Sequence, residues 1–414
     1  MLSRRRFLAG GGATLGAAAA ASVVGLELSD RSTAGTAASE SKGIEPFYGR
    51  HQGGIATAQQ DRLLFAAFDL TSDRRADIVQ LMQQWTTAAA SMTAGRPVGP
   101  PDTSDLAPPN DTGEALGLDP ARLTLTFGFG PGVFTSNGVD RYGLAHLRPA
   151  ELADLPRFAH DQLDPGYTGG DICVQACSND PLVAYHAVRN LTRIALGTAE
   201  LRWTEQGFGR TSSTTPDQVT PRNLMGFKDG TDNIRSGTNV FDDSVWVPAP
   251  STPAWMAGGS YMVVRRIRMH IEVWDRAALE DQQETIGRLK DSGAPIGAHQ
   301  ERDPINLHAE GPDGKPRIPV DAHVRLANQS ANGIHILRRG YSFTDGIDPD
   351  TGQLDAGLFF IAYQRDPRKQ FVAIQHRLDG DALNEYIQHV GSALFAVPPG
   401  ASGPGDYVGS ALFQ

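Results

Sequence analysis

The chain has 414 residues, which is long enough for one large domain or for two domains of ordinary size. Hydrophobic residues make up 40% of the chain and charged residues 20%, which is typical of a globular protein. The formal net charge of −10 at pH 7 disfavours binding to nucleic-acid phosphates, so we expect no nucleic-acid partner.

The first residues indicate an export signal. Consecutive arginines at Arg4–Arg6 precede Phe7 and Leu8, and a Gly- and Ala-rich apolar run continues to about Leu26. The segment resembles the S-R-R-x-F-L signal of the twin-arginine pathway, so residues 1–40 are expected to be a signal peptide and linker read by the twin-arginine translocase. The alternative is a retained anchor helix. Export would place the protein in the periplasm or, in a cell with one membrane, outside the cell or in its envelope.

Strands and helices alternate in the first half of the remaining chain. An apolar run after Arg62 predicts a buried strand, and the stretch that follows it has helical periodicity. A Pro-, Asp- and Gly-rich segment then predicts an exposed loop. The expected elements are a strand over 63–70, a helix over 73–94, a loop over 97–117, strands over 123–130 and 171–178, a helix over 181–195 and a strand over 201–208.

The second half repeats this alternation. The expected elements are a strand over 259–269, a helix over 270–290, a strand over 357–364 and a helix over 367–378. Two halves of this kind predict an α+β fold made of two sheet domains. The polar stretch 211–222 is expected to contain the boundary between them.

Both cysteines, Cys173 and Cys177, lie on one face of the strand expected over 171–178. Four residues of extended chain separate their Cα atoms by roughly 13 Å, beyond the reach of a disulfide. We therefore expect two reduced cysteines packed in a sheet.

Three local patterns carry candidate chemistry. The first is a carboxylate, Asp229, between a lysine and a glycine, which taken alone is also compatible with an ordinary Asp-Gly turn. The second is His323, which could bind iron or be a hydrogen-bonded structural histidine. The third is the pair Arg338–Arg339 after an apolar approach, where paired arginines are more often solvated.

Together these segments resemble the DyP-type (dye-decolorising) haem peroxidases, in particular their exported deferrochelatase/peroxidase branch. The family's G-x-x-D-G corresponds to residues 226–230, its D-A-H-x-R-L-A-N to 321–328, and its L-R-R-G-Y-S to 337–342. Shorter matches occur at 51–55, 286–288, 293–295 and 406–412, so the resemblance extends from about residue 45 to the C-terminus.

The resemblance implies two ferredoxin-like domains, 45–215 and 216–414, with one haem b per chain held mainly by the second. It implies that His323 is the proximal iron ligand and that Asp229 and Arg338 lie on the distal, peroxide-binding side. The residues expected along the haem edge are Gly230, Thr231, Asp232, Asn328, Gln329 and Ser330.

The chain departs from the family after the histidine. The common N-P-R reads Asn328-Gln329-Ser330, which removes a cation that would pair with a haem propionate. The resemblance also suggests a carboxylate partner for His323 Nδ1, for which Glu385 and Asp321 are the two candidates.

The implied function is a haem peroxidase that reduces hydrogen peroxide and oxidises phenolic or dye-like one-electron donors. Asp229 would move a proton between the peroxide oxygens, and Arg338 would stabilise the charge on the departing oxygen. An aspartate stays ionised in acid, so we expect an acidic pH optimum. Two alternatives stay open: a deferrochelatase that takes haem as substrate and releases its iron, and an exported haem carrier without turnover. The sequence leaves a homo-oligomer open.

Overall fold

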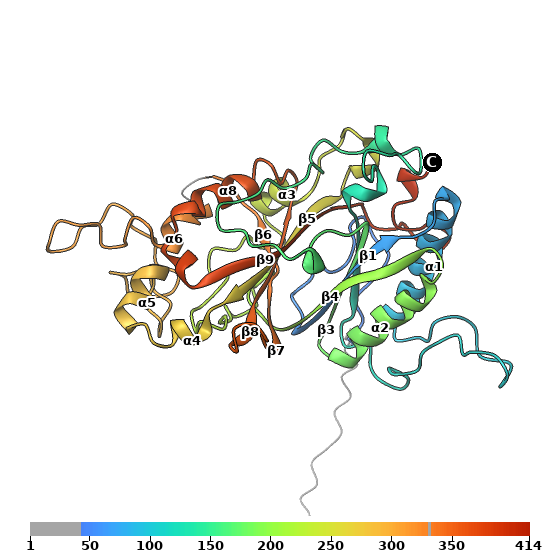
Figure 1. Cartoon of the computed structure of the whole chain (residues 1–414), viewed down its shortest axis with the longest axis horizontal. Coiled ribbons are helices and arrows are strands. Elements are labelled where there is room, and N and C mark those ends of the chain that lie inside the picture. The colour runs from blue at the N-terminus through green and yellow to red at the C-terminus, as the bar shows by residue number, and fades with distance from the viewer. Residues whose placement is uncertain (1–42, 330–332) are drawn as a thin grey trace, which may run out of the picture. The chain divides into compact units, whose positions relative to one another are not determined.

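A computed structural model describes residues 43–329 and 333–414, which belong to one compact unit (Figure 1). The expected export signal and Ser330 lie outside the described residues. Within 43–329 and 333–414, no helix is both long enough and apolar enough to span a membrane.

The first half contains four antiparallel strands and two helices. Strand β1 pairs with β3 on one side and with β4 on the other, and β2 adds to the free edge of β3. The predicted elements of this half are confirmed to within about two residues at each end. Their bounds are β1 Arg62–Leu70, α1 Arg75–Thr93, β2 Thr124–Phe129, β3 Ile172–Ser178, α2 Pro181–Ile194 and β4 Ala199–Arg210.

The second half also contains antiparallel strands, but sequence patterns missed several of them. The strands expected over 259–269 and 357–364 are confirmed, whereas β6, β7, β9 and the short helix α3 were not predicted. The elements are α3 Asn239–Val245, β5 Ser260–Met269, α4 Ile271–Trp274, α5 Leu279–Ile286, α6 His323–Leu326, β6 Leu337–Arg338, β7 Tyr341–Ile347, β8 Leu354–Gln364, α8 Phe371–Arg377 and β9 Ile387–Val397.

The single helix expected over 270–290 is wrong, because the chain breaks between α4 and α5. Gln282 explains the break, because its Nε2 donates hydrogen bonds to the carbonyls of Trp274 and Ala277. A side chain of α5 thus takes up backbone acceptors that the end of α4 would otherwise leave without a donor. Gly287, with φ +86°, then ends α5 in the left-handed conformation.

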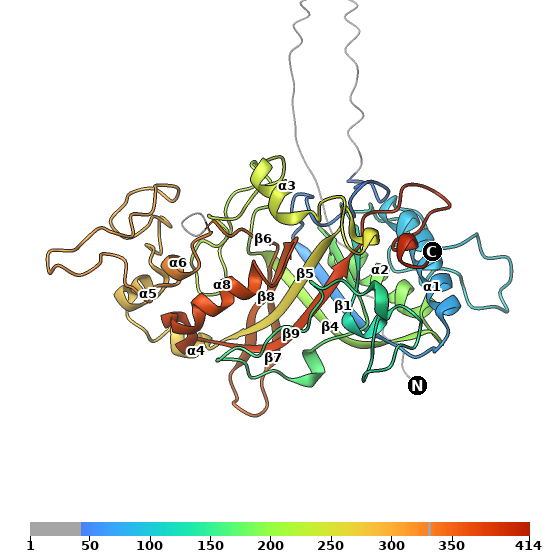
Figure 2. The same ribbon diagram turned by 90° about the horizontal axis from the view of Figure 1, so that it is seen from above.

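The strands of the two halves form one sheet, in the order β5-β9-β2-β3-β1-β4-β7-β8-β6. An additional β5–β8 pairing closes it into a barrel-like ring, and Figure 2 shows these strands side by side. The two halves meet where Phe208 of β4 pairs with Ser342 of β7, and where Phe129 of β2 pairs with Ala396 of β9.

Both faces of the central strands are buried, which explains their continuous apolar sequences. Along β1, Leu64, Ala66 and Phe68 pack in the cluster under α1 and α2, while Leu63 and Phe65 pack in a second cluster that contains residues of both halves. The strand β3 alternates in the same way.

Cys173 and Cys177 are free and fully buried in the second cluster, as expected. Burial raises the pKa of both thiols, so neither is an activated nucleophile.

Candidate functional site

A cavity lies against the outer face of the second half's sheet, on the face opposite the second apolar cluster. Strand β5 shows the two sides: Met262 and Val264 belong to that cluster, whereas Arg265, Ile267 and Met269 line the cavity. The cavity holds about 1390 Å³ of free space, including the part open to solvent. Its apolar lining consists of Met225, Phe227, Ile267, Met269, Ile286, Val324, Ala327, Ile336, Leu358, Phe360, Phe371, Ile374, Leu378, Leu383 and Ile387.

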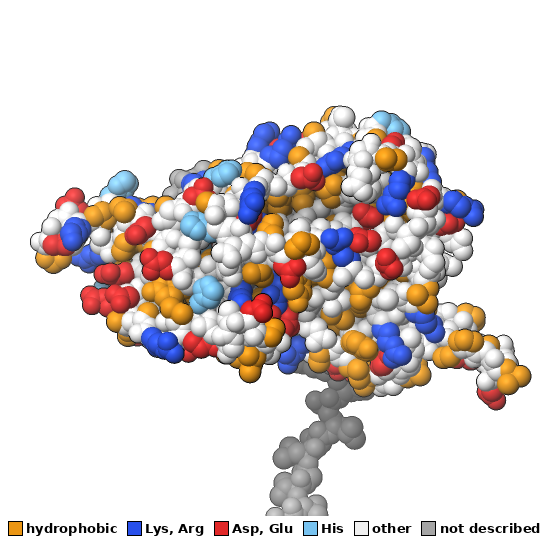
Figure 3. Space-filling view, viewed as in Figure 1, with side chains coloured by type: hydrophobic (Ala, Val, Ile, Leu, Met, Phe, Trp, Pro, Cys, Tyr) orange, Lys and Arg blue, Asp and Glu red, His pale blue; other side chains and the backbone are white. Residues whose placement is uncertain are grey.

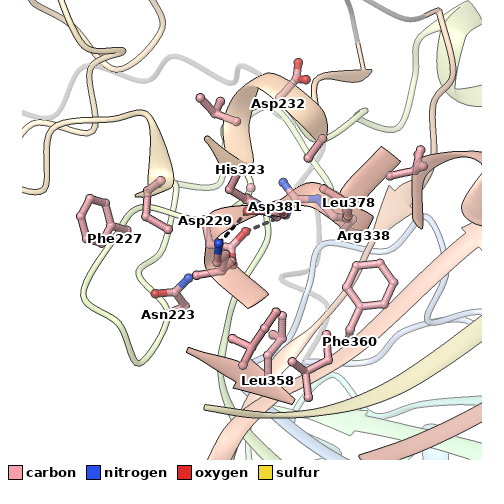
Figure 4. A pocket seen from close by; sticks show the side chains of 18 of the residues that line it. Asn223, Phe227, Asp229, Asp232, His323, Arg338, Leu358, Phe360, Leu378 and Asp381 are labelled. Carbon is pink, nitrogen blue, oxygen red and sulfur yellow. Dashed lines mark hydrogen bonds and ion pairs between the residues drawn. The ribbon is translucent and has the colours of Figure 1, made fainter. Parts of the chain in front are cut away.

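Asp229 enters the cavity from a tight loop (Figure 4). The backbone N–H of Asp229 donates to the Pro221 carbonyl at 2.9 Å, and that of Asn223 donates to the Phe227 carbonyl at 3.1 Å, so the loop is a short hairpin. Asn223 Nδ2 donates to Asp229 Oδ2 at 3.2 Å. The carboxylate is therefore oriented by its own loop.

Gly230 allows this loop to approach the rest of the protein. Its φ is +98°, and a Cβ at this position would lie 2.8 Å from the Ser212 Cα, a backbone atom that has no freedom to move away. Only glycine meets both conditions without strain. The second glycine of the motif thus has a structural reason independent of any ligand.

Arg338 reaches the same point from β6. Its Nη1 donates to Asp229 Oδ1 at 2.7 Å, and both side chains are largely shielded, with exposed fractions of 24% for Arg338 and 14% for Asp229. The backbone of Arg338 is clamped by Asn233, whose Oδ1 accepts from its N–H at 2.8 Å and whose Nδ2 donates to its carbonyl at 2.9 Å. Asn233, which sequence reasoning missed, joins the Asp229 loop to β6.

His323 begins α6 and faces the same cavity. Its Nδ1 lies 2.6 Å from Asp381 Oδ2, and Asp381 Oδ1 accepts from the Leu383 N–H at 2.8 Å. A carboxylate on Nδ1 favours the tautomer that leaves the Nε2 lone pair for a metal.

Both candidates that the sequence offered as the partner of His323 are wrong. Glu385 and Asp321 are exposed, and the partner is Asp381. Asp321 contributes only its backbone carbonyl, which accepts from the Ala382 N–H at 3.0 Å and thereby fixes the Asp381 turn beside α6. No local sequence pattern could identify Asp381 as the partner, because it lies 58 residues from His323 in the chain.

The electrostatics of the three groups are coupled. Burial lowers the pKa of His323, but the charge and hydrogen bond of the Asp381 carboxylate oppose burial, and the pKa lies above its ordinary value. Asp229 raises the pKa of His323 further and Arg338 lowers it. All three side chains line the same cavity, so their charges influence one another there.

The other predicted site residues line this cavity too. Gln329 donates its N–H to Asp232 Oδ2 at 3.1 Å, and its Oε1 accepts from the Ile336 N–H at 2.7 Å. Thr231 Oγ1 donates to Glu301 Oε1 at 3.1 Å. The structure thus gathers every described residue predicted for the site: Asp229, Gly230, Thr231, Asp232, His323, Asn328, Gln329 and Arg338.

Arg288 is a cavity residue that the sequence analysis did not assign. It is 7% exposed, and its Nη1 donates to the carbonyls of Gly293 at 2.7 Å and Glu301 at 2.9 Å. Burial lowers its pKa, while Asp232 and Glu301 oppose that shift. Its Nε and Nη2 make no hydrogen bond to the described residues, so half of a buried guanidinium remains available in the cavity. The resemblance of Ile286-Gly287-Arg288 to the DyP-type family could have identified this residue from the sequence.

The donor set suits haem better than a bare metal ion. Among the described residues, no group of three or more His, Cys, Asp or Glu side chains could hold a metal ion. A haem iron needs only one protein ligand, and His323 with a carboxylate on Nδ1 has the form of such a ligand. The apolar walls fit a porphyrin, and Arg288 offers a cation for a propionate.

Figure 3 shows acidic and basic side chains interspersed over the visible face, without a continuous basic patch.

Comparison with known families matches both halves of the chain. Residues 52–209 match the model of the N-terminal part of the Dyp-type peroxidases, and residues 220–402 match that of the C-terminal part.

Individual relatives match over most of their length. A deferrochelatase of Escherichia coli O6:K15:H31 is 38% identical over 100% of this chain and 97% of its own length. Among solved structures, DtpA from Streptomyces lividans, in an oxyferrous complex, is 41% identical with a TM-score of 0.81, covering 90% of this chain and 99% of that one. A DyP-type peroxidase from Cellulomonas bogoriensis is 39% identical with a TM-score of 0.80, covering 90% and 98%.

Proposed function

The chain belongs to the DyP-type peroxidase family and is a haem-dependent peroxidase, and we propose that hydrogen peroxide is reduced in the cavity shared by His323, Asp229 and Arg338. One observation carries this assignment: a histidine held by a buried carboxylate lines the same cavity as a hydrogen-bonded aspartate–arginine pair.

In this proposal one haem b binds per chain, with His323 Nε2 as the iron ligand. The bound haem supplies the electrons that cleave the oxygen–oxygen bond. Asp381 keeps the imidazole in the required tautomer, and the apolar walls exclude water from the porphyrin faces. Arg288 is the candidate partner for a propionate, in place of the cation missing after Asn328. The cavity residues Gly230, Thr231, Asp232, Asn328 and Gln329 complete the proposed haem edge. Ser330, expected there from the sequence, lies outside the described residues.

The distal pair supplies the acid–base chemistry. Asp229 takes the proton from one peroxide oxygen and returns it to the other, which then leaves as water. Two of the carboxylate's lone-pair directions are used by Arg338 and Asn223, and the others remain for peroxide. Arg338 is always cationic and stabilises negative charge on the departing oxygen.

We also propose that each half is a ferredoxin-like domain, with the boundary near residues 211–222. The strand order β2-β3-β1-β4 with helices after β1 and β3 supports this for the first half. The order β9-β5-β8-β7 repeats it in the second half.

A second function, iron release from haem, is favoured by the relatives named deferrochelatase. It would use the same cavity, because haem would then be the substrate. Incubating the purified protein with haem and measuring metal-free protoporphyrin tests this function directly.

A haem carrier without turnover would not need the Asp229–Arg338 pair. The deciding experiment is an absorption spectrum of the haem-loaded protein before and after one equivalent of peroxide, followed by addition of a dye. A peroxide-dependent shift of the haem band with dye oxidation, both lost in His323→Ala, supports the peroxidase. A spectrum unchanged by peroxide would favour the carrier.

We further propose export by the twin-arginine pathway, on the strength of the motif at Arg4–Arg6. Replacing Arg4, Arg5 and Arg6 by lysine is expected to retain the protein in the cytoplasm, as measured by cell fractionation. Unchanged export would contradict the proposal.

A further inference from the structure

The carboxylate of Glu301 binds the Asp229 loop on both sides of Asp229. Lys228, which directly precedes Asp229, donates a hydrogen bond from Nζ to Glu301 Oε2 at 2.5 Å. Thr231, two residues after Asp229, donates from Oγ1 to Glu301 Oε1 at 3.1 Å. Lys228 and Thr231 line the cavity, whereas Glu301 is not part of the lining that the described residues form. Each oxygen of Glu301 therefore holds one flank of Asp229 from outside the cavity.

The contact between Glu301 and Lys228 is shielded from solvent. The two side chains are 16% and 24% exposed, so their charges attract each other more strongly than those of an ion pair on the open surface. Burial raises the pKa of Glu301, but the hydrogen bond and charge of Lys228 and two threonine hydroxyls oppose burial, and the pKa lies below its ordinary value. Glu301 thus stays ionised in mildly acidic solution, where Asp229 is expected to act as a base.

The backbone that carries Glu301 is fixed. Its carbonyl accepts a hydrogen bond from Arg288 Nη1 at 2.9 Å, and the same nitrogen donates to the Gly293 carbonyl at 2.7 Å. Arg288 is 7% exposed and lines the cavity. Because this anchor orders the chain around Glu301, less conformational entropy opposes the hydrogen bonds of its side chain.

The same segment of the chain, 288–301, supports the hairpin as a whole. Arg222, at the start of the hairpin, donates to two backbone carbonyls of this segment at 2.6 Å each. The stem of Lys228 packs on Gly293, where a Cβ would lie 2.7 Å from Lys228 Cδ. The hairpin is thus seated on this segment, and Glu301 supplies a charged contact between the two.

The direction and the position of the Asp229 carboxylate have different determinants. Asn223 and Arg338 bind its two oxygens and so set its direction. The residues on either side of it are bound to Glu301, which therefore acts on the position of the backbone. A general base must lie within hydrogen-bond reach of the proton that it takes, and a misplacement of about 1 Å costs roughly 10²-fold in rate.

We propose that Glu301 is a positioning residue for the reaction with peroxide. By binding Lys228 and Thr231, it sets the position of the Asp229 carboxylate in the cavity. Glu301 itself touches neither haem nor peroxide and takes no proton. The inference rests on the peroxidase function proposed above and adds a residue on which the rate of that reaction depends.

Stopped-flow mixing of the haem-loaded protein with hydrogen peroxide tests the effect on the rate. We expect Glu301→Gln to slow the reaction roughly 5- to 30-fold, because an amide has one acceptor oxygen and cannot replace both contacts. Haem affinity should stay that of the wild type. Glu310→Gln, at an exposed carboxylate farther along the chain, is the matched control and should react like the wild type. An unchanged rate in Glu301→Gln, or an equal loss of haem affinity, would overturn the proposal.

A double-variant cycle with Asp229→Asn separates positioning from a general loosening of the cavity. If Glu301 acts through Asp229, Glu301→Gln should slow the protein that has Asp229 but should not slow Asp229→Asn any further. Effects that multiply in the double variant would show that Glu301 acts independently of Asp229, and the proposal would then be wrong.

Hydrogen–deuterium exchange tests the hold on the loop without turnover. The backbone N–H groups of residues 226–233 should exchange roughly 5- to 30-fold faster in Glu301→Gln than in the wild type, while those of β1 should not change. Lys228→Met removes the same contact from the other side and should give the same increase, so it serves as a second test if Glu301→Gln does not fold.

Equal exchange of this loop in both variants and the wild type would contradict the proposal. If the wild type does not react with peroxide at all, the peroxidase function fails, whereas the exchange comparison still decides whether Glu301 holds the loop.

Discussion

The Nδ1 of His323 lies 2.6 Å from Asp381 Oδ2, although 58 residues separate the two in the chain. The carboxylate is almost fully buried, with 3% of its side chain exposed, and its other oxygen is held by the Leu383 N–H. The histidine is thus oriented by the protein before any iron is bound.

Replacing this carboxylate should weaken the haem site. We expect Asp381→Asn to lower haem affinity or peroxidase activity by about 10- to 100-fold, because an amide stabilises the required imidazole orientation less well. Haem titration of the apoprotein measures the effect. Glu385→Gln and Asp321→Asn are the matched controls, since both carboxylates are exposed and should be neutral. A larger effect from either control than from Asp381→Asn would contradict the assignment.

Asp229 should be needed for the reaction with peroxide but not for haem binding. Asp229→Asn keeps the shape of the side chain and its contact with Arg338, yet removes the base, so we expect the rate to fall by about 10²–10⁴-fold. Stopped-flow mixing of the haem-loaded protein with hydrogen peroxide measures this rate. Asp291→Asn, at an exposed carboxylate, should react like the wild type. An unchanged rate in Asp229→Asn would remove Asp229 from the mechanism.

Local patterns in the sequence were sufficient to predict the strands and helices of the first half and most of the residues that line the cavity. The run Leu63–Phe68 is apolar on both faces because it packs between two clusters, and this was readable as a buried strand. Asp229, His323 and Arg338 each lie in a short motif, so the resemblance identified them together. Their convergence on one cavity required the fold.

What the sequence could not supply depends on contacts between distant segments. Asp381 and Asn233 act through hydrogen bonds to residues 58 and 105 positions away. The strand β9 was missed where Gly391 interrupts its pattern, and the structure explains that glycine: a Cβ there would lie 2.7 Å from the Tyr167 carbonyl oxygen. The break before α5 depends on the side chain of Gln282.

Arg288 should bind a haem propionate. We expect Arg288→Met to weaken the binding of iron protoporphyrin by roughly 10- to 100-fold, because a buried charge-assisted hydrogen bond is lost. The same variant should bind the dimethyl ester of that haem as well as the wild type does, since the ester carries no propionate charge. Arg302→Met is the matched control, because Arg302 lies nearby but outside the cavity lining. An equal loss with both forms of haem would indicate a general packing role instead.

Glu205 should make the stability of the protein depend on pH. Its side chain is fully buried on β4, where Oε2 lies 2.6 Å from Arg266 Nε and Oε1 has no hydrogen-bond partner among the described residues. Burial raises the pKa of Glu205 to about 7, against the opposing effect of Arg266. Between the ordinary carboxyl pKa and about 7, the folded protein keeps a proton that the unfolded chain has released.

The free energy of unfolding should therefore fall as pH rises from about 5 to 8, by about 2–3 kcal/mol from this group. Glu205→Gln removes the titrating carboxyl group, and Arg266 would still pair with Asp345 and Asp355. The difference in the free energy of unfolding between this variant and the wild type should therefore shift by about 2–3 kcal/mol in favour of the variant between pH 5 and pH 8. Denaturant unfolding at pH 5 and pH 8 measures the difference. Glu200→Gln, at an exposed position of the same strand, should show no such change. Parallel pH dependence of Glu205→Gln and the wild type would show that Glu205 is already ionised in the folded protein at pH 5.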